Sequence, residues 1–137
     1  MSAIARRTIR LAPTPAAPAA ARHALAWLEP HVDARRYANL RLAVTELVAN
    51  AIEHGGGGVP EGVVEVGICV GEHSVRVDVR DAGARFTPPL PPSAPPLGSP
   101  RGRGLMLVDR LSDRFGVAGP SHLWVEVDRD AADGTLA

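Results

Sequence analysis

The chain has 137 residues, with 15 arginine or lysine side chains against 15 aspartate or glutamate side chains, and its formal net charge at pH 7 is zero. A chain of this length fits one domain with one core, and the balanced charge argues against direct binding to nucleic acid. Cys69 is the only cysteine, which excludes an internal disulfide and a thiolate metal cluster.

Every basic side chain is arginine or histidine, because the sequence contains no lysine. A Walker-type phosphate loop, a protein kinase of the common fold and a Schiff-base enzyme each need a lysine, so these classes are excluded. No stretch is long and apolar enough to cross a membrane, and the first residues lack the apolar segment of a secretory signal. We therefore expect a cytoplasmic protein without membrane contacts.

The first third of the chain predicts a strand and two helices. Residues 8–11 have the pattern of a short strand, and residues 16–28 have apolar side chains at helical spacing, with Pro30 expected to end that helix. Asp33 is suited to cap a second helix that runs to about His54, where four successive glycines end it.

The rest of the chain predicts a hairpin, a long loop, a helix and two strands. Residues 63–70 and 74–80 alternate in hydrophobicity around a tight turn, as in a hairpin with one buried side. Residues 81–101 carry seven prolines, which is typical of a lid or binding loop. The pattern then predicts a helix over residues 102–111, strands over 114–117 and 121–127, and a loose tail over 128–137.

This order of elements indicates an α+β two-layer sandwich, with helices on a mixed, mostly antiparallel sheet. We expect one domain over residues 1–137, with its core in about residues 8–127 and a proline-rich lid at about residues 85–101.

Two polar residues stand out on the helix that ends near His54. Apolar residues occupy nearly every side of this helix, including Leu42 on the side opposite the main apolar stripe, which predicts that the helix is largely buried all round. Glu46 and Asn50 are four residues apart, so they lie on one face and one turn from each other.

This pair admits two interpretations. A buried carboxylate is costly unless it is paired, bound to a metal or poised for proton transfer. Asn50 offers a carbonyl oxygen suited to Mg²⁺, and Glu46 could hold a metal-bound water or accept a proton from an attacking hydroxyl. The alternative, which the pair by itself favours, is a hydrogen bond that pins two helices together.

Two other segments are suited to a nucleotide. Asp81 follows a strand and could accept a hydrogen bond from an exocyclic amine such as that of adenine, while Gly83 would let a base pack on the backbone. Gly102 and Gly104 begin a helix whose N–H groups would cradle phosphate. The ordinary alternatives are an Asp-x-Gly turn and a flexible loop end. His54 could favour the helix dipole or approach a phosphate.

Together, these segments resemble the motifs of the Bergerat-fold (GHKL) ATPases, the superfamily of DNA gyrase, histidine kinases and MutL. The run E-x-x-x-N-A-x-x-H-G that begins at Glu46 resembles the N-box, and Asp81-Ala82-Gly83 resembles the start of the adenine-binding box. Gly102-Arg103-Gly104-Leu105 resembles the second glycine box, and residues 85–101 lie where the ATP lid belongs.

Within the superfamily, the chain most resembles the anti-sigma-factor serine/threonine kinases. The G-R-G-L-x-L-V-x-x-L-S run over residues 102–112 and the closing strand over residues 123–127 match that branch, and the resemblance covers about residues 8–127. It implies that the chain binds Mg·ATP, captures a sigma factor and phosphorylates a serine of a STAS-type anti-sigma antagonist. Relatives of this kind commonly form homodimers.

The resemblance also implies roles for individual residues. Glu46 would be the general base, Asn50 the magnesium ligand and Asp81 the partner of the adenine amine. The other residues expected at the nucleotide are His54, Gly83, Gly102, Arg103, Gly104 and Leu105, with Gly83 shaping the base pocket and Gly102 and Gly104 cradling phosphates.

Two features depart from the family pattern. Arg85 replaces the second glycine of the usual D-x-G-x-G box, and the lid is rich in prolines, which lack N–H groups and resist bending. Both affect phosphoryl transfer more than ATP binding. One alternative is therefore a module that binds ATP, or only its partner, and sequesters that partner without kinase activity. Another is an α+β interaction domain without a nucleotide.

Overall fold

The computed structural model of the chain describes residues 3–54, 62–81, 104–119 and 121–129. The order of its elements agrees with the sequence-based prediction. In chain order they are β1 (Ala3–Leu11), α1 (Ala17–Ala24), the 3-10 helix η1 (Ala26–His31), α2 (Ala34–His54), β2 (Val64–Gly71), β3 (Ser74–Asp81), α3 (Gly104–Leu111), β4 (Arg114–Gly119) and β5 (His122–Asp128).

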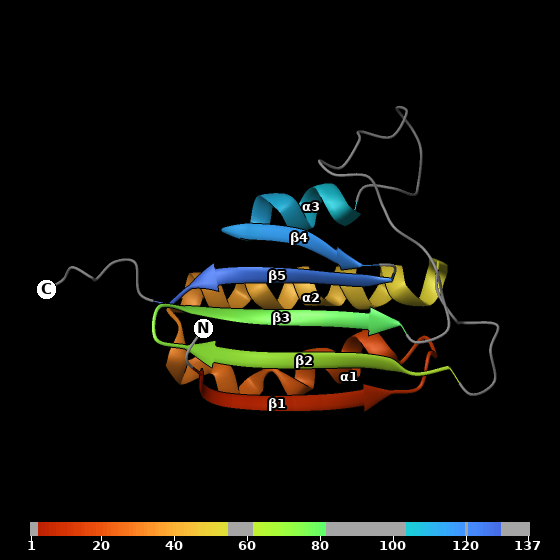
Figure 1. Cartoon of the computed structure of the whole chain (residues 1–137), viewed down its shortest axis with the longest axis horizontal. Coiled ribbons are helices and arrows are strands. Elements are labelled where there is room, and N and C mark those ends of the chain that lie inside the picture. Colours follow the sequence, from red (N-terminus) through yellow and green to blue (C-terminus); the bar gives the residue numbers. More distant parts are fainter. Residues whose placement is uncertain (1–2, 55–61, 82–103, 120, 130–137) are drawn as a thin grey trace, which may run out of the picture.

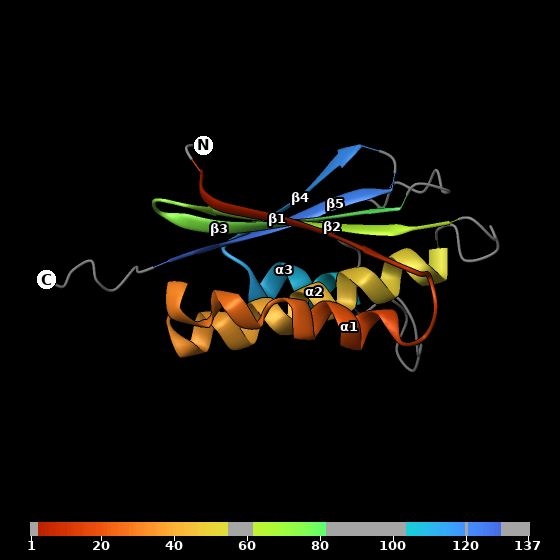
Figure 2. The same ribbon diagram turned by 90° about the horizontal axis from the view of Figure 1, so that it is seen from below.

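The described elements form two layers. The strands make a five-stranded sheet in the order β1-β2-β3-β5-β4, and each described strand pair is antiparallel. The three α-helices cover one face of this sheet, with α2 behind β3 and β5 (Figures 1 and 2). The expected α+β two-layer sandwich is confirmed.

The core lies between these layers because the strands alternate in hydrophobicity. Val66 of β2 pairs with Val79 of β3, which pairs in turn with Leu123 of β5, and all three side chains point toward the helices. Burial of a valine or leucine side chain stabilises a fold by about 1.5–3 kcal/mol. On the helix side, Leu40 and Leu47 of α2 have no exposed surface, so α2 is the central helix of the core.

The beginning of α2 confirms the predicted cap at Asp33. The backbone N–H of Arg36 donates a hydrogen bond to Oδ1 of Asp33 over 2.8 Å, which satisfies one of the free N–H groups of the first turn. The Arg36 guanidinium pairs with the other carboxylate oxygen at 2.7 Å. These bonds fix the residue at which α2 starts. The start of the helix in turn determines which residues of its later turns face the sheet.

Three local expectations were wrong. The strand expected over residues 8–11 begins at Ala3, because this edge strand is held by backbone pairing with β2 and needs no hydrophobic alternation. The first α-helix ends at Ala24, and the chain continues as η1 through Pro30 to His31. Leu42 is 44% exposed, so α2 is not buried on every side.

The sheet face opposite the helices carries polar side chains. Asp78 of β3 accepts hydrogen bonds from Arg76 over 2.9 Å and from His122 over 2.6 Å. The Arg76 guanidinium lies 4.4 Å from the ring centre of Trp124.

None of the described helices is both long and apolar enough to cross a membrane.

Candidate functional site

Glu46 and Asn50 lie at the border of the buried face of α2. Both side chains are half-buried, while the neighbouring Leu47 and Val48 have no exposed surface. Because Leu47 and Val48 fix the rotation of α2 on the sheet, Glu46 and Asn50 are held one turn apart at this border. The expectation that they lie on one face of the helix is confirmed.

Glu46 lies directly against the first residue of α3. A Cβ atom built on Gly104 would be 2.6 Å from Oε1 of Glu46, which is closer than non-bonded atoms approach each other. The predicted N-box helix and the start of the predicted glycine-box helix therefore meet at this carboxylate. Sequence reasoning placed both residues in one site but did not predict their contact.

An open pocket of about 430 Å³ lies beside this contact, lined by Glu46 and Gly104 together with Met106, Leu107 and Arg110 of α3. Arg110 is exposed, so the pocket has one acidic and one basic side chain on an otherwise apolar lining. The last three residues were missed at the sequence level. Helical spacing places Met106 and Arg110 on one face of α3, away from the core residue Val108, but it does not show that this face borders Glu46.

Asp81 ends β3 and is nearly buried, with 5% of its surface exposed. Its backbone N–H donates a hydrogen bond to the carbonyl oxygen of Ser121 over 2.9 Å, and its partner across the sheet is Val64. An ionised carboxylate accepts hydrogen bonds only, which is the chemistry that the sequence analysis predicts for Asp81.

The three predicted segments point toward the same end of the molecule. The last turns of α2, the end of β3 and the start of α3 all lie on the right in Figure 1, and Figure 2 places α2 and α3 on the same face of the sheet. The antiparallel topology explains this arrangement, because α2 and β3 both run toward that end while α3 runs away from it.

The remaining predicted site residues divide into two groups. Leu105 is half-buried and packs against the core, so its side chain anchors α3. Residues outside the described part of the chain are Gly83, Gly102 and Arg103, together with Arg85 and the expected lid over residues 85–101; of His54, only the helical backbone is described. In the described ranges, no group of three or more His, Cys, Asp or Glu side chains has the arrangement of a metal site.

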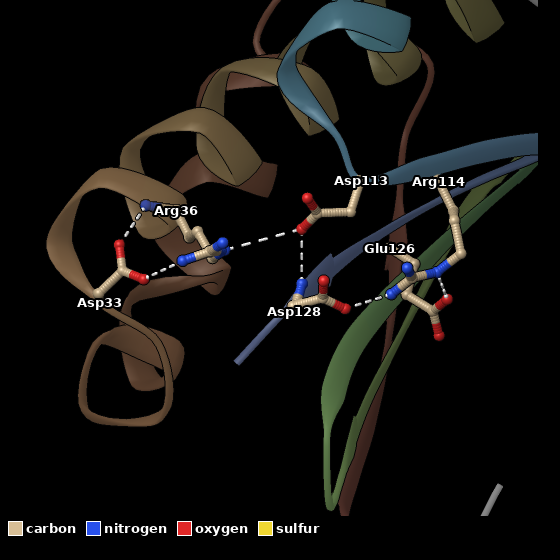
Figure 3. Close-up of polar contacts among 6 residues, drawn as sticks. All are labelled: Asp33, Arg36, Asp113, Arg114, Glu126 and Asp128. Carbon is tan, nitrogen blue, oxygen red and sulfur yellow. Dashed lines mark hydrogen bonds and ion pairs between the residues drawn. The ribbon is translucent and has the colours of Figure 1, made fainter. Parts of the chain in front are cut away.

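The other ends of α2 and α3 are joined by a polar network (Figure 3). Arg36 of α2 pairs with Asp33 and approaches Asp113, which follows α3. Hydrogen bonds from the Arg36 backbone and side chain lower the pKa of Asp33, and the bond to Asp33 raises the pKa of Arg36. This network ties α3 to α2 at the end away from Asn50 and Asp81.

Arg114 extends the network onto β5. Its guanidinium donates hydrogen bonds to the carboxylates of Asp128 and Glu126, which raises the pKa of Arg114. Asp113 accepts the backbone N–H of Asp128 over 2.7 Å. The turn between α3 and β4 is therefore fixed to the end of the sheet, and this holds the end of α3 in place.

The chain matches the model of the histidine kinase-like ATPase domain over residues 11–127. This match spans both layers of the fold and the helices that carry Glu46 and Gly104. The chain belongs to the histidine kinase-like ATPase domain family. Its members are ATPase-like domains, and the two-layer fold described above agrees with this membership.

Among solved structures, the fold is similar to that in a crystal structure of the RsbU and RsbW domains of Rv1364c from Mycobacterium tuberculosis. The TM-score is 0.64 at 24% sequence identity, and the match covers 91% of this chain and 32% of the other. The chain thus spans about a third of that protein, and the likeness concerns the fold. No curated protein matches the sequence.

Proposed function

We propose that this domain binds Mg·ATP and transfers the γ-phosphoryl group to a serine of a STAS-type anti-sigma antagonist, and that it sequesters a sigma factor in the cytoplasm. The observation that carries the proposal is the contact between Glu46 and Gly104, which joins the helix of the expected base to the helix of the expected phosphate-binding segment. Membership of the ATPase family and similarity to the fold of an RsbW-containing structure support it.

Each residue has a defined part in this proposal. The carboxylate of Asp81 would accept the hydrogen bond of the adenine amine, for which its buried place at the end of β3 is suited. The side-chain oxygen of Asn50 would bind Mg²⁺, a hard cation that prefers such ligands and shares its shell with phosphates. The magnesium ion supplies charge neutralisation on the phosphates.

Glu46 would act on the acceptor. The serine hydroxyl oxygen forms a bond to the γ-phosphorus, the bond from that phosphorus to the bridging oxygen of the β-phosphate breaks, ADP leaves, and the hydroxyl proton passes to the Glu46 carboxylate. The pocket beside Glu46 gives an acceptor side chain room to approach, with Arg110 at its rim.

A pull-down followed by a transfer assay tests the proposal. Proteins retained by the immobilised chain with and without Mg·ATP are incubated with radiolabelled ATP, and we expect label on a serine of a retained STAS-type protein. Glu46→Gln should reduce the rate roughly 100-fold or more. Glu72→Gln, in the exposed turn between β2 and β3, is the matched control and should keep the wild-type rate. Transfer at the wild-type rate by Glu46→Gln would eliminate Glu46 as the base.

A second candidate is sequestration without transfer, which Arg85 and the proline-rich segment over residues 85–101 favour. Such a module would retain a sigma factor or its antagonist but place no label on it. Calorimetry separates its two forms, because one binds Mg·ATP and the other only the partner. Sedimentation of the purified chain tests whether it forms the homodimer common among its relatives.

A further inference from the structure

A side chain at Gly104 would meet the Glu46 carboxylate. An added Cβ would lie 2.6 Å from Oε1, 3.6 Å from Cδ and 3.8 Å from Cβ of Glu46, and these are its three nearest atoms. The Glu46 side chain thus takes the space that a side chain would need at this position. The absence of a Cβ at Gly104 allows the Glu46 carboxylate to lie against the start of α3.

The consequence of adding a methyl group follows from which atom is in the way. Oε1 is the end of a flexible side chain, so alanine at position 104 would turn the carboxylate away and leave the backbones of α2 and α3 in place. Gly116 is a contrasting case, because its Cβ would meet the Trp124 ring at 2.6 Å. Gly67 has nothing within 4 Å of the same position, which makes it a matched control.

We infer that Gly104 is a positioning residue for Glu46. Because Gly104 has no side chain, the Glu46 carboxylate can lie at the junction of α2 and α3. The effect on phosphoryl transfer rests on the proposed function, whereas the effect on the carboxylate does not. This assigns Gly104 a task beyond its expected contact with phosphate, which needs only the backbone N–H that alanine also has.

Displacement of the carboxylate should affect transfer more than nucleotide binding. A general base must reach the proton it accepts at hydrogen-bond distance, and a misplacement of about 1 Å can cost roughly 100-fold in rate. The backbone N–H survives in Gly104→Ala, so the dissociation constant of Mg·ATP should change by less than about threefold while the transfer rate falls roughly 100-fold.

The experiment compares Gly104→Ala with Gly67→Ala in the full chain. The carboxyl carbons of glutamate are isotope-labelled, the Glu46 signal is assigned by its loss in Glu46→Gln, and its chemical shift is measured by NMR. Nucleotide affinity and transfer rate are measured on the same samples. We expect Gly104→Ala to move the Glu46 signal, and Gly67→Ala to leave it as in the wild type.

A double variant tests whether the effect passes through Glu46. Aspartate is one methylene shorter than glutamate, so it withdraws the carboxylate from the space beside position 104. Gly104→Ala should therefore cause little further loss of transfer in a Glu46→Asp background, and the two substitutions should be strongly non-additive. Additive losses would mean that Gly104 acts by another route.

The outcomes separate this inference from the proposed function. An unchanged Glu46 signal in Gly104→Ala overturns the inference whatever the activity. A shifted signal with an unchanged transfer rate, in a protein whose wild type is active, overturns the positioning role. A shifted signal in a protein whose wild type transfers no phosphoryl group supports the placement of the carboxylate by Gly104 and refutes the proposed kinase function.

Discussion

Arg36 and Asp113 connect the beginning of α2 to the end of α3, with Nε of Arg36 3.7 Å from Oδ2 of Asp113 (Figure 3). The same oxygen of Asp113 accepts the backbone N–H of Asp128 over 2.7 Å. Asp113 therefore holds three elements together at the end of the molecule away from Asn50 and Asp81. At its other end, α3 is bounded by Gly104 and the Glu46 carboxylate, so both ends of this short helix depend on carboxylates.

Removal of the Asp113 carboxylate should loosen this anchor. Asp113→Ala leaves the Asp128 N–H without its acceptor, and we expect the free energy of unfolding to fall by about 1–2 kcal/mol. Urea denaturation measures the loss. Asp109→Ala, which removes an exposed carboxylate from α3, should be nearly neutral. Equal stability of the two variants would show that the network contributes nothing.

The acid limit of stability should depend on Asp78. Burial by itself raises the pKa of this carboxyl, but hydrogen bonds from Arg76 and His122 outweigh it and bring the pKa below 3.8. Because the folded pKa is lower than the unfolded one, Asp78 stabilises the fold above the unfolded pKa, and this contribution is lost as the pH falls through the folded pKa. Asp33, whose pKa is also lowered, acts in the same direction.

Urea denaturation at a series of pH values tests this dependence. The urea concentration at the wild-type unfolding midpoint should fall as the pH drops below the unfolded pKa of aspartate, roughly 3.9. Asp78→Asn should lower stability at neutral pH and flatten this part of the curve, because the variant has one fewer carboxyl group to protonate. A curve parallel to that of the wild type would assign the acid sensitivity to other carboxylates.

Strong periodicity explains how much of the fold the sequence predicted. The alternation of Val64, Val66 and Ile68 leaves one arrangement for β2, and the Asp33 cap with the glycines after His54 defines the length of α2. Reasoning from hydrophobic periodicity failed where the packing of the helix on the sheet determines which apolar side chains are buried. Leu42 is apolar, but it is 44% exposed, because Leu40, Val44 and Leu47 occupy the buried side of α2.

The candidate site was predictable only in part, for a related reason. Glu46 and Asn50 were found because helical spacing places them together, and Asp81 because it ends a strand. Gly104 was found as a glycine before a helix, but its contact with Glu46 depends on how α2 and α3 pack across residues far apart in the sequence. Arg110 and Met106 join the pocket through the same packing, which spacing within one helix does not reveal.

Gly116→Ala should be costly for folding, in contrast to Gly104→Ala. Its Cβ would collide with the indole ring of Trp124, which lies across the sheet from it and is covered by the Arg76 guanidinium. Overpacking of this kind typically costs about 1–3 kcal/mol. Thermal unfolding should rank Gly116→Ala below Gly104→Ala, with Gly67→Ala closest to the wild type in this comparison. A reversed order would show that the Trp124 ring moves aside freely.

Stabilisation by nucleotide should distinguish the roles of Asn50 and Asp81. At a free Mg·ATP concentration 100 times the dissociation constant, a ligand that binds only the folded state adds about 2.7 kcal/mol, which a thermal shift detects. Asn50→Ala should lose the magnesium-dependent part of this shift and keep the part seen with ATP and EDTA. Asp81→Asn should reduce both parts, because an amide in place of the carboxylate presents a donor as well as an acceptor to the adenine amine.

GTP, which has a carbonyl in place of that amine, should not stabilise the wild type. If Asn50→Ala and Asp81→Asn both shift as the wild type does, the nucleotide binds elsewhere on the domain.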